Sequence, residues 1–408
     1  MVALFLLLGA LSEAADPVQD LAERGTALKA KGDAAGALEV YRQAAELDPR
    51  SAHLQDEVGF LLAVLGRRAE AIQSFQHAIE LDPKFAPAQY HLGAVYWLDK
   101  NPGLSIPHLQ SAAALDPGNF EYQYKLGETL KLQGEDGAAL PHLRAAVAAD
   151  SKHWDAWNSL GMALENTGDL AAAVDAFEHA VDVNPTDPDA RNNLGATLVK
   201  TRRADAGITQ FQKILDADPA YNMARVNLGF AYIQKGDPDK AAEQLREAIR
   251  REPDLAVAHY DLGVALKNKD DLDAAKVEFA RTLELDPSMA EAHYTLGITH
   301  WQMGDFDEAA KEMQAAIRLR QDYGQAYSML GTVLKQKGDR EGAETALRTA
   351  IRLDPEDPGP YNTLGQLLRQ KGDLEGSKAA FAQGAQVKQT KEAELGRMLQ
   401  KKDSPGEK

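Results

Sequence analysis

The sequence predicts an all-α protein made of repeated pairs of antiparallel helices, and three observations support this. A glycine recurs every 34 residues with no insertion, from Gly25 to Gly365. Apolar residues around each of these marker glycines keep the spacing of one helix face. A turn signal then separates each segment from a second helical one. A fixed period of this size indicates supersecondary units that stack because each is too small to bury its own apolar face.

The repeat period divides the chain into three parts. Residues 1–17 lie outside the pattern, residues 18–391 hold eleven copies, and residues 392–408 follow the last copy. The copies are 18–51, 52–85, 86–119, 120–153, 154–187, 188–221, 222–255, 256–289, 290–323, 324–357 and 358–391. The core is therefore expected to be linear and to grow with each added repeat.

The fifth copy, 154–187, shows how the first helix of a repeat is built. Trp157, Leu160 and Leu164 lie four before, one before and three after the marker Gly161. At about 100° per residue these side chains project from one side of a helix, so we expect them in the core. Gly168 and Asp169 then favour a left-handed helix end and an N-cap for the next helix.

The second helix of the same copy carries a large residue between two small ones. Ala173, Phe177 and Ala180 are spaced four and three residues apart. This pattern lets two helices approach closely while one aromatic ring fills the gap between them. Asn184 followed by Pro185 favours the end of this helix, because the residue before proline avoids the helical region.

The residue pattern of the copies resembles that of the tetratricopeptide repeat family, which is W-x2-L-G-x2-Y, then G-D, then A-x3-F-x2-A and a terminal proline. The resemblance covers residues 18–391. It implies a right-handed superhelical solenoid of antiparallel helix pairs, in which the first helices line an inner groove that mostly binds peptides or proteins. The pairing of a lysine with an asparagine that forms the family's two-carboxylate clamp is absent from every copy.

Some copies depart from the pattern. Lys100, Arg202 and Asp270 stand where other copies have the glycine between the helices, and we expect tighter or frayed turns there. Pro107 and Pro141 occupy equivalent places inside two neighbouring second helices. Each removes one backbone hydrogen bond, so we expect a modest change of curvature near the third and fourth repeats.

Composition limits the classes of partner. Asp and Glu total 62 against 45 Lys and Arg, which gives a net charge of −17. Such a field repels phosphate backbones and anionic lipid heads, so nucleic acid is disfavoured and basic or neutral ligands are favoured. The chain has no cysteine, which excludes disulfides and thiolate metal sites.

The two ends carry separate signals. Residues 2–11 are almost entirely apolar and are followed by Ser12, Glu13, Ala14 and Ala15, which favours a secretory signal cleaved near Ala14 or Ala15. No Lys or Arg precedes this run, so a misassigned start codon or an apolar N-terminal helix stays open. If the segment is a secretory signal, the protein is expected to be periplasmic or secreted. If it is one of the two alternatives, the protein is expected to be cytoplasmic. After residue 391, we expect a capping helix and a disordered tail.

The face of each first helix opposite the core is the candidate recognition surface. It holds residues six and three before the marker glycine and one, four and five after it. Candidate ligand contacts there are Phe60, Tyr90, Trp97, Tyr124, Asn158, Asn192, Phe230, Tyr260, Lys267, Tyr294, Trp301, Lys335 and Arg369. The aromatic residues are suited to binding, but they can instead pack against the neighbouring repeat and widen the core.

Two further asparagines, Asn193 and Asn227, lie two before the glycine in consecutive copies. They resemble part of the asparagine ladder in the repeats of O-GlcNAc transferase, which holds an extended peptide backbone. An amide both donates and accepts hydrogen bonds, which suits capture of a peptide with little sequence preference. Ser159, Asp261 and Thr295 occupy the flanking positions, so the predicted ladder is short.

Catalytic and metal-binding signatures are absent from the sequence. There is no H-E-x-x-H pair, P-loop, dinucleotide motif or nucleophile elbow, so we expect neither an enzyme nor a cofactor. His108 with His142 and His259 with His293 stand 34 residues apart, which repetition alone explains.

Three functions remain open from the sequence. The first is a non-catalytic scaffold that binds a protein or peptide. The second is an accessory or substrate-recognition subunit of a separately encoded enzyme, such as a glycosyltransferase or envelope-polymer machinery. The third is a structural solenoid that forms oligomers, although a monomer is the simpler expectation.

Overall fold

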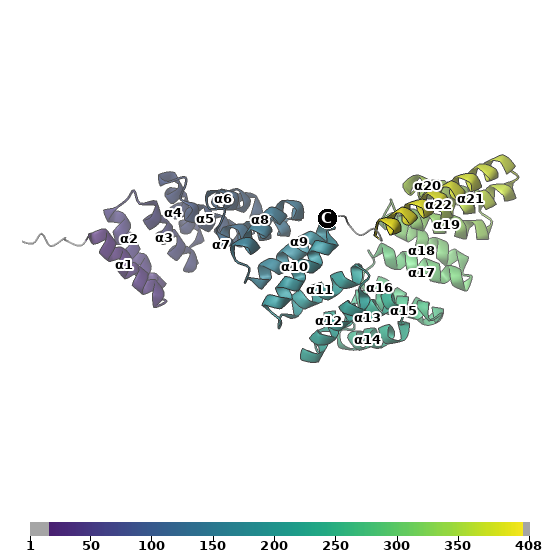
Figure 1. Cartoon of the computed structure of the whole chain (residues 1–408), viewed down its shortest axis with the longest axis horizontal. Coiled ribbons are helices and arrows are strands. Elements are labelled where there is room, and N and C mark those ends of the chain that lie inside the picture. The colour runs from purple at the N-terminus through teal and green to yellow at the C-terminus, as the bar shows by residue number, and fades with distance from the viewer. Residues whose placement is uncertain (1–15, 403–408) are drawn as a thin grey trace, which may run out of the picture. The chain divides into compact units, whose positions relative to one another are not determined.

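The computed structural model describes residues 16–402, and within them the fold is an all-α solenoid of antiparallel helix pairs (Figure 1). The helices are α1 (Pro17–Ala30), α2 (Ala34–Leu47), α3 (Ala52–Val64), α4 (Arg68–Leu81), α5 (Ala86–Leu98), α6 (Pro102–Leu115), α7 (Phe120–Leu132), α8 (Asp136–Ala149), α9 (Trp154–Asn166), α10 (Leu170–Val183), α11 (Pro188–Lys200), α12 (Ala204–Ala217), α13 (Asn222–Lys235), α14 (Pro238–Arg251), α15 (Ala256–Asn268), α16 (Leu272–Leu285), α17 (Ala290–Met303), α18 (Phe306–Leu319), α19 (Gly324–Lys337), α20 (Arg340–Leu353), α21 (Pro358–Lys371) and α22 (Leu374–Lys402). Odd-numbered helices are the first helices of the repeats and even-numbered ones the second, which confirms the predicted all-α class.

The chain divides into two compact units, Met1–Thr197 and Leu198–Lys408, and the division falls inside α11. In each unit, the helices other than α11 pack against their partner in the same repeat, and successive repeats pack through helices adjacent in sequence, as α2 and α3 or α12 and α13 do. Successive first helices also contact one another, as α3 and α5 or α13 and α15 do. Among the helices of residues 16–402, the backbones of successive second helices stay farther apart, although side chains meet across them, as Arg42 on α2 and Glu70 on α4 do at 3.7 Å. Within each unit the first helices therefore form the more closely spaced layer. The face of the first helices that points away from the second helices is the concave, inner side of the stack.

The core of a repeat forms as its spacing predicts. In the fifth repeat Ala173, Phe177 and Ala180 of α10 are fully buried, and Leu160 and Leu164 of α9 are nearly so. The marker glycine lies directly against the large residue: a methyl group on Gly161 would come within 2.6 Å of the Phe177 ring. Interiors are close-packed, so this contact leaves no room for a side chain.

Two repeats place serine where the others have a small apolar residue, and the structure shows why this is tolerated. The Ser105 hydroxyl donates a hydrogen bond of 2.8 Å to the carbonyl of Gly93, and Ser377 donates one of 2.8 Å to the carbonyl of Gly365. Both hydroxyls are buried. Each has therefore found an acceptor on the facing first helix, as buried polar groups require.

The turns between paired helices keep one backbone conformation even where glycine is absent. Glycines at this position have φ between 75° and 88°, and Lys100, Arg202 and Asp270 have φ of 56°, 63° and 64°. The expected tighter or frayed turn is therefore wrong: these residues adopt the same left-handed turn and accept its steric cost. The helices that carry Pro107 and Pro141, α6 and α8, each continue through the proline.

Asp270→Gly is expected to raise the free energy of unfolding by about 0.5–1 kcal/mol, because glycine removes the clash that a Cβ makes at positive φ. Urea denaturation followed by circular dichroism measures the change. Gly168→Ala, which introduces the same clash in another turn, serves as the opposite control and should lose a similar amount. A variant Asp270→Gly no more stable than the parent would contradict this account.

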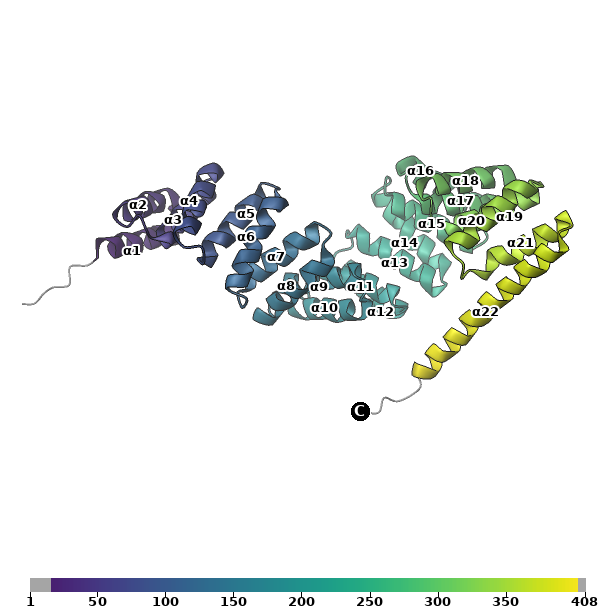
Figure 2. The ribbon, with the colours of Figure 1, turned by 90° about the horizontal axis from the view of Figure 1, so that it is seen from above.

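The predicted separate capping helix after residue 391 is not a new element. Instead α22 runs as one helix of 29 residues from Leu374 to Lys402, past the end of α21 (Figure 2). The predicted signal at residues 1–15 and the tail at residues 403–408 lie outside the described residues. Among the helices that the structure describes, none has the length and apolar character needed to cross a bilayer.

Candidate binding face on the first helices

The predicted tyrosines of the first unit lie half-buried on the inner side, in contact with other rings. The ring of Tyr90 on α5 lies 4.9 Å from that of Tyr122 on α7, centre to centre. Tyr124 stacks on Phe120 at 5.4 Å. Burial raises the pKa of Tyr90 to about 12 and also raises the pKa of Tyr124. These hydroxyls therefore stay uncharged, and both rings widen the interface between repeats as well as facing the inner side.

Trp97 near the end of α5 is placed differently, at the edge of a surface cavity. The ammonium of Lys125 on α7 lies 4.0 Å from the centre of the indole. Burial lowers the pKa of this lysine, and a cation at this distance from an indole face is attracted to it. The cavity, of about 310 Å³, is lined by Trp97, Leu98, Lys100, Pro102, Thr129, Leu132 and Gln133.

Phe60 on α3 is exposed over 38% of its surface and contacts two polar residues. The ammonium of Lys29 lies 5.5 Å from its ring, and the ring of His91 is also 5.5 Å away. Lys29 in turn forms an ion pair of 2.5 Å with Glu57. Phe60 therefore retains free apolar surface beside a local group of charges.

The aromatic residues of the second unit range from exposed to packed. Phe230 on α13 is 37% exposed. Tyr260 packs near Phe279, and Tyr294 lies 5.0 Å from the ring of Tyr323. Trp301 on α17 packs against a buried cluster that includes Met313 and Leu330.

The asparagines form one observed pair and one pair that stays a prediction. Asn193 on α11 donates a hydrogen bond of 3.0 Å to the amide oxygen of Asn158 on α9. Asn192 is buried, with 9% of its surface exposed. Asn193 belongs to the first unit and Asn227 to the second, so a ladder between those two residues is still an expectation.

The three predicted cations lie on first helices of the second unit. Lys267 is half-buried near the end of α15, and Arg369 is exposed near the end of α21. Lys335 on α19 donates a hydrogen bond of 2.7 Å to Gln366 on α21. They lie on α15, α19 and α21, and α17 separates the first of these helices from the other two, so the structure does not gather the three cations into one basic cluster.

A recurring contact links successive first helices, and it was not recognised from the sequence. The residue three positions before one marker glycine contacts the residue two positions before the marker glycine of the next repeat. The two residues are 35 positions apart in the sequence, and we call such a pair a floor pair. Asp56 with His91 at 2.8 Å, Asn158 with Asn193 at 3.0 Å and Tyr260 with Thr295 at 3.3 Å are floor pairs. Tyr124 and Ser159 stand at the same two positions of their repeats. Aligning the copies with an offset of one residue would have revealed these polar partners.

A second recurring contact explains the position four before the marker glycine, which we expected to be simple core. Its side chain donates a hydrogen bond to the carbonyl six residues earlier, at the end of the preceding repeat. The donors and distances are Gln123 at 3.1 Å, Trp157 at 3.0 Å, Arg191 at 2.6 Å, Arg225 at 2.9 Å, His259 at 2.9 Å and Tyr361 at 3.2 Å. The position therefore accepts any long side chain that can donate, whatever its class.

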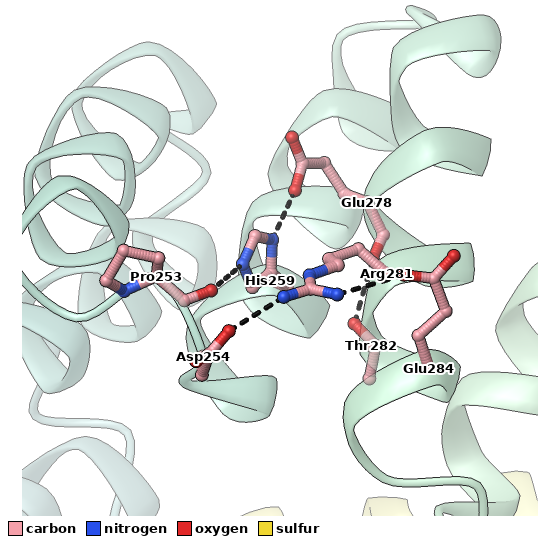
Figure 3. A network of polar contacts seen from close by, with 7 residues as sticks. All are labelled: Pro253, Asp254, His259, Glu278, Arg281, Thr282 and Glu284. Atoms are coloured by element: carbon pink, nitrogen blue, oxygen red, sulfur yellow. Dashed lines mark hydrogen bonds and ion pairs between the residues drawn. The ribbon is translucent and has the colours of Figure 1, made fainter.

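Figure 3 shows this contact in the eighth repeat. The imidazole Nε2 of His259 donates to the Pro253 carbonyl at 2.9 Å, and its Nδ1 lies 2.6 Å from a carboxylate oxygen of Glu278 on α16. Arg281, nearby on α16, donates to Asp254 at 2.7 Å and to Glu284 at 3.0 Å. The histidines that the 34-residue spacing placed in register therefore act in structural networks, and residues 16–402 contain no group of three or more metal-ligating side chains.

Exchanging the two partners of the His259 pair is expected to be nearly neutral. In the fourth repeat the order is reversed: Gln123 on the first helix meets His142 on the second at 2.8 Å and still donates to the Pro117 carbonyl. The double variant His259→Gln with Glu278→His should therefore unfold within about 1 kcal/mol of the parent, whereas His259→Ala should cost about 2 kcal/mol. Urea denaturation decides this; a double variant as unstable as the alanine variant would show that the two orders are not equivalent.

Comparison with protein families agrees with this geometry. A family model described as the cilia and flagella-associated protein 70 C-terminal domain matches residues 139–399, which is more than half of the chain. A model described as a TPR repeat matches residues 59–99, and one described as a tetratricopeptide repeat matches residues 21–51. No curated protein matches the chain.

Several solved structures are similar to it. A structure titled as YrrB, a TPR protein with an unusual peptide-binding site, is 26% identical, with 46% of this chain and 96% of that chain covered and a TM-score of 0.44. MamA is 28% identical over 40% of this chain and 95% of its own, with a TM-score of 0.37. Yeast Tom70 is 14% identical over 94% of this chain and 96% of its own, with a TM-score of 0.49.

The family models, the eleven glycine-marked copies and the stacked helix pairs lead to one conclusion. The chain belongs to the tetratricopeptide repeat family, and its residues 139–399 belong with the repeat domain described as the cilia and flagella-associated protein 70 C-terminal domain.

Proposed function

We propose that the chain is a non-catalytic scaffold that binds a protein or an extended peptide against the inner side of its first helices. The observation that carries the proposal is an aliphatic stripe, Val64, Leu98 and Leu132, at equivalent positions of three successive first helices. These side chains are 58%, 51% and 61% exposed. The next two copies have Asn166 and Lys200 at the same position, so the stripe is confined to repeats two to four.

The surroundings of the stripe support binding rather than chance exposure. Single exposed leucines are ordinary, but exposed apolar residues that recur in register, two of them lining one cavity, are of the kind that marks interaction sites. Leu98 and Leu132 both line the cavity beside Trp97. An apolar side chain of a ligand would therefore find an indole, two leucines and the Thr129 side chain in one place.

The test compares two charge insertions of the same kind. Leu98→Glu with Leu132→Glu places carboxylates in the stripe, and Leu104→Glu with Leu115→Glu places them at exposed leucines of α6, a second helix. Both double variants should keep the parent's helical circular dichroism. Pull-down from the native host should then lose its partners for the stripe variant and keep them for the α6 variant. Equal capture by both variants would refute the assignment of the binding face.

We also propose that the protein is exported, on the basis of the apolar segment of residues 2–11 and the small residues that follow it. Determining the N-terminus of the protein purified from its native host tests this. A mature chain that begins near Ala15 supports export, and one that begins at Met1 contradicts it.

A further inference from the structure

Asp261 is a buried acid at a floor-pair position of the second unit whose counterpart is apolar. By the offset of 35 residues it faces Val226 on α13, whose apolar side chain is 98% removed from solvent and offers no polar partner. Asp261 itself is only 7% exposed. Among the described residues it makes no hydrogen bond or ion pair, and burial raises its pKa to about 7.

Charged groups on the helices packed around α15 have partners other than Asp261. Arg225 on α13 donates to Gln244 at 3.1 Å and to the Pro219 carbonyl at 2.9 Å. Glu247 on α14 pairs with Arg251 at 2.7 Å, Glu278 on α16 with His259 at 2.6 Å, and Glu291 on α17 with Arg320 at 2.6 Å. On α15 itself, Tyr260 precedes Asp261 and hydrogen-bonds to Thr295 of α17. The ammonium of Lys267 lies on the same helix but forms no ion pair with Asp261.

We propose that Asp261 is the recognition residue of a subsite on α13, α15 and α17 that takes the cationic side chain, Lys or Arg, of a bound peptide. The proposal rests on the peptide-binding function proposed above and names part of the ligand's chemistry. Its basis is the juxtaposition of a buried carboxyl, an apolar partner at its floor-pair position, and the inner side of the stack.

Charge complementarity selects a cation over the other occupants. A carboxylate only accepts hydrogen bonds, and a buried one is stabilised chiefly by a paired cation that also donates to it. The aliphatic stem of Lys or Arg is matched by Phe230, which is 37% exposed and lies one helical turn after Val226 on α13. The net charge of −17 raises the local concentration of basic ligands.

A recognition residue and a structural residue differ in how they affect the free protein. The folded protein holds the Asp261 proton up to a pH of about 7, whereas the unfolded chain loses it near 4. The free protein is therefore destabilised as the pH rises from about 4 to about 7, and the penalty is constant above that range. Asp261→Asn should remove this penalty.

The first arm of the experiment measures thermal stability without ligand. Asp261→Asn is expected to raise the melting temperature by about 2 °C or more at pH 8 and to leave it nearly unchanged at pH 4. The control is Asp322→Asn, at an exposed aspartate in the loop before α19, which should change neither value. A lower melting temperature for Asp261→Asn at pH 8 would make Asp261 a stabilising structural residue and overturn the proposal.

The second arm uses a random nonapeptide display library as the probe, selected on the full-length parent at pH 8. Selected peptides are expected to share a Lys or Arg at one position and to lose about 30-fold or more in affinity for Asp261→Asn, with no loss for Asp322→Asn. Peptides that bind without a basic residue, or bind Asp261→Asn equally well, would overturn the subsite and leave the scaffold function standing. Failure to select any peptide would count against both proposals.

Discussion

Gly161→Ala is expected to lower the free energy of unfolding by about 1–3 kcal/mol, although alanine is the better helix former. The new methyl group would lie 2.6 Å from two ring carbons of Phe177, inside van der Waals contact. Phe177 is fully buried and surrounded by other core residues, so its ring has no free space to move into. The cost of overpacking therefore exceeds the gain in helix propensity.

Two other glycines provide matched controls for this prediction. At Gly297 the nearest atom is the terminal methyl of Met313, at 2.8 Å, and a flexible thioether gives way more easily than a ring. At Gly137 on α8 a methyl group would meet no atom within 4 Å. Gly297→Ala should therefore cost less than Gly161→Ala, and Gly137→Ala should stabilise by about 0.5–1 kcal/mol.

Urea denaturation of the three variants, followed by circular dichroism, gives their order of stability. The expected order is Gly137→Ala above the parent, Gly297→Ala below it, and Gly161→Ala lowest. If Gly161→Ala were as stable as Gly137→Ala, the 34-residue glycine could not be explained by close approach of the two helices.

Trp301→Ala is expected to lower the free energy of unfolding by about 2–3 kcal/mol, because its indole packs against the buried cluster around Met313 and Leu330. Trp97→Ala should cost only about 1 kcal/mol. Its indole lines an open cavity, and its described cation contact is with the ammonium of Lys125. The two tryptophans, equivalent by sequence position, are therefore expected to differ in effect.

Paired measurements separate packing from binding for these residues. Each variant is unfolded in urea, and each is tested for capture of the partners that the parent protein retains. Trp97→Ala should keep its fold and lose capture, and Trp301→Ala should lose stability first. Equal destabilisation by both substitutions would show that Trp97 belongs to the core as well.

The sequence predicted the repeat because each of its rules is local. The marker glycine, the small residue twelve later and the large residue sixteen later all act within one helix pair, so helical geometry relates them directly. Phe177 and Ala173 were predicted to be buried for this reason, and they are. The turn at Asp270 was misjudged because the packing of its two helices outweighs the conformational preference of one residue.

The binding face was less predictable because it depends on pairs of repeats. Helical position placed Tyr90 and Trp97 on the same side of α5, but not what each one touches. Tyr122 and Lys125, which decide that, come from the next repeat. Likewise, Asp261 is distinctive only because Val226 stands 35 residues earlier, and a residue-by-residue inspection of one copy does not show this.

The close contact between paired helices lies within a single helix pair, since the marker glycines other than Gly195 each meet the large residue sixteen positions later in the same repeat. Opening one hairpin at an end of a unit therefore leaves the glycine contacts of all the others intact. Amide hydrogen exchange should accordingly be graded along each unit, fastest in the outermost hairpin and slower inward. A scaffold of this kind can release a bound segment by fraying locally, without unfolding the rest of its length.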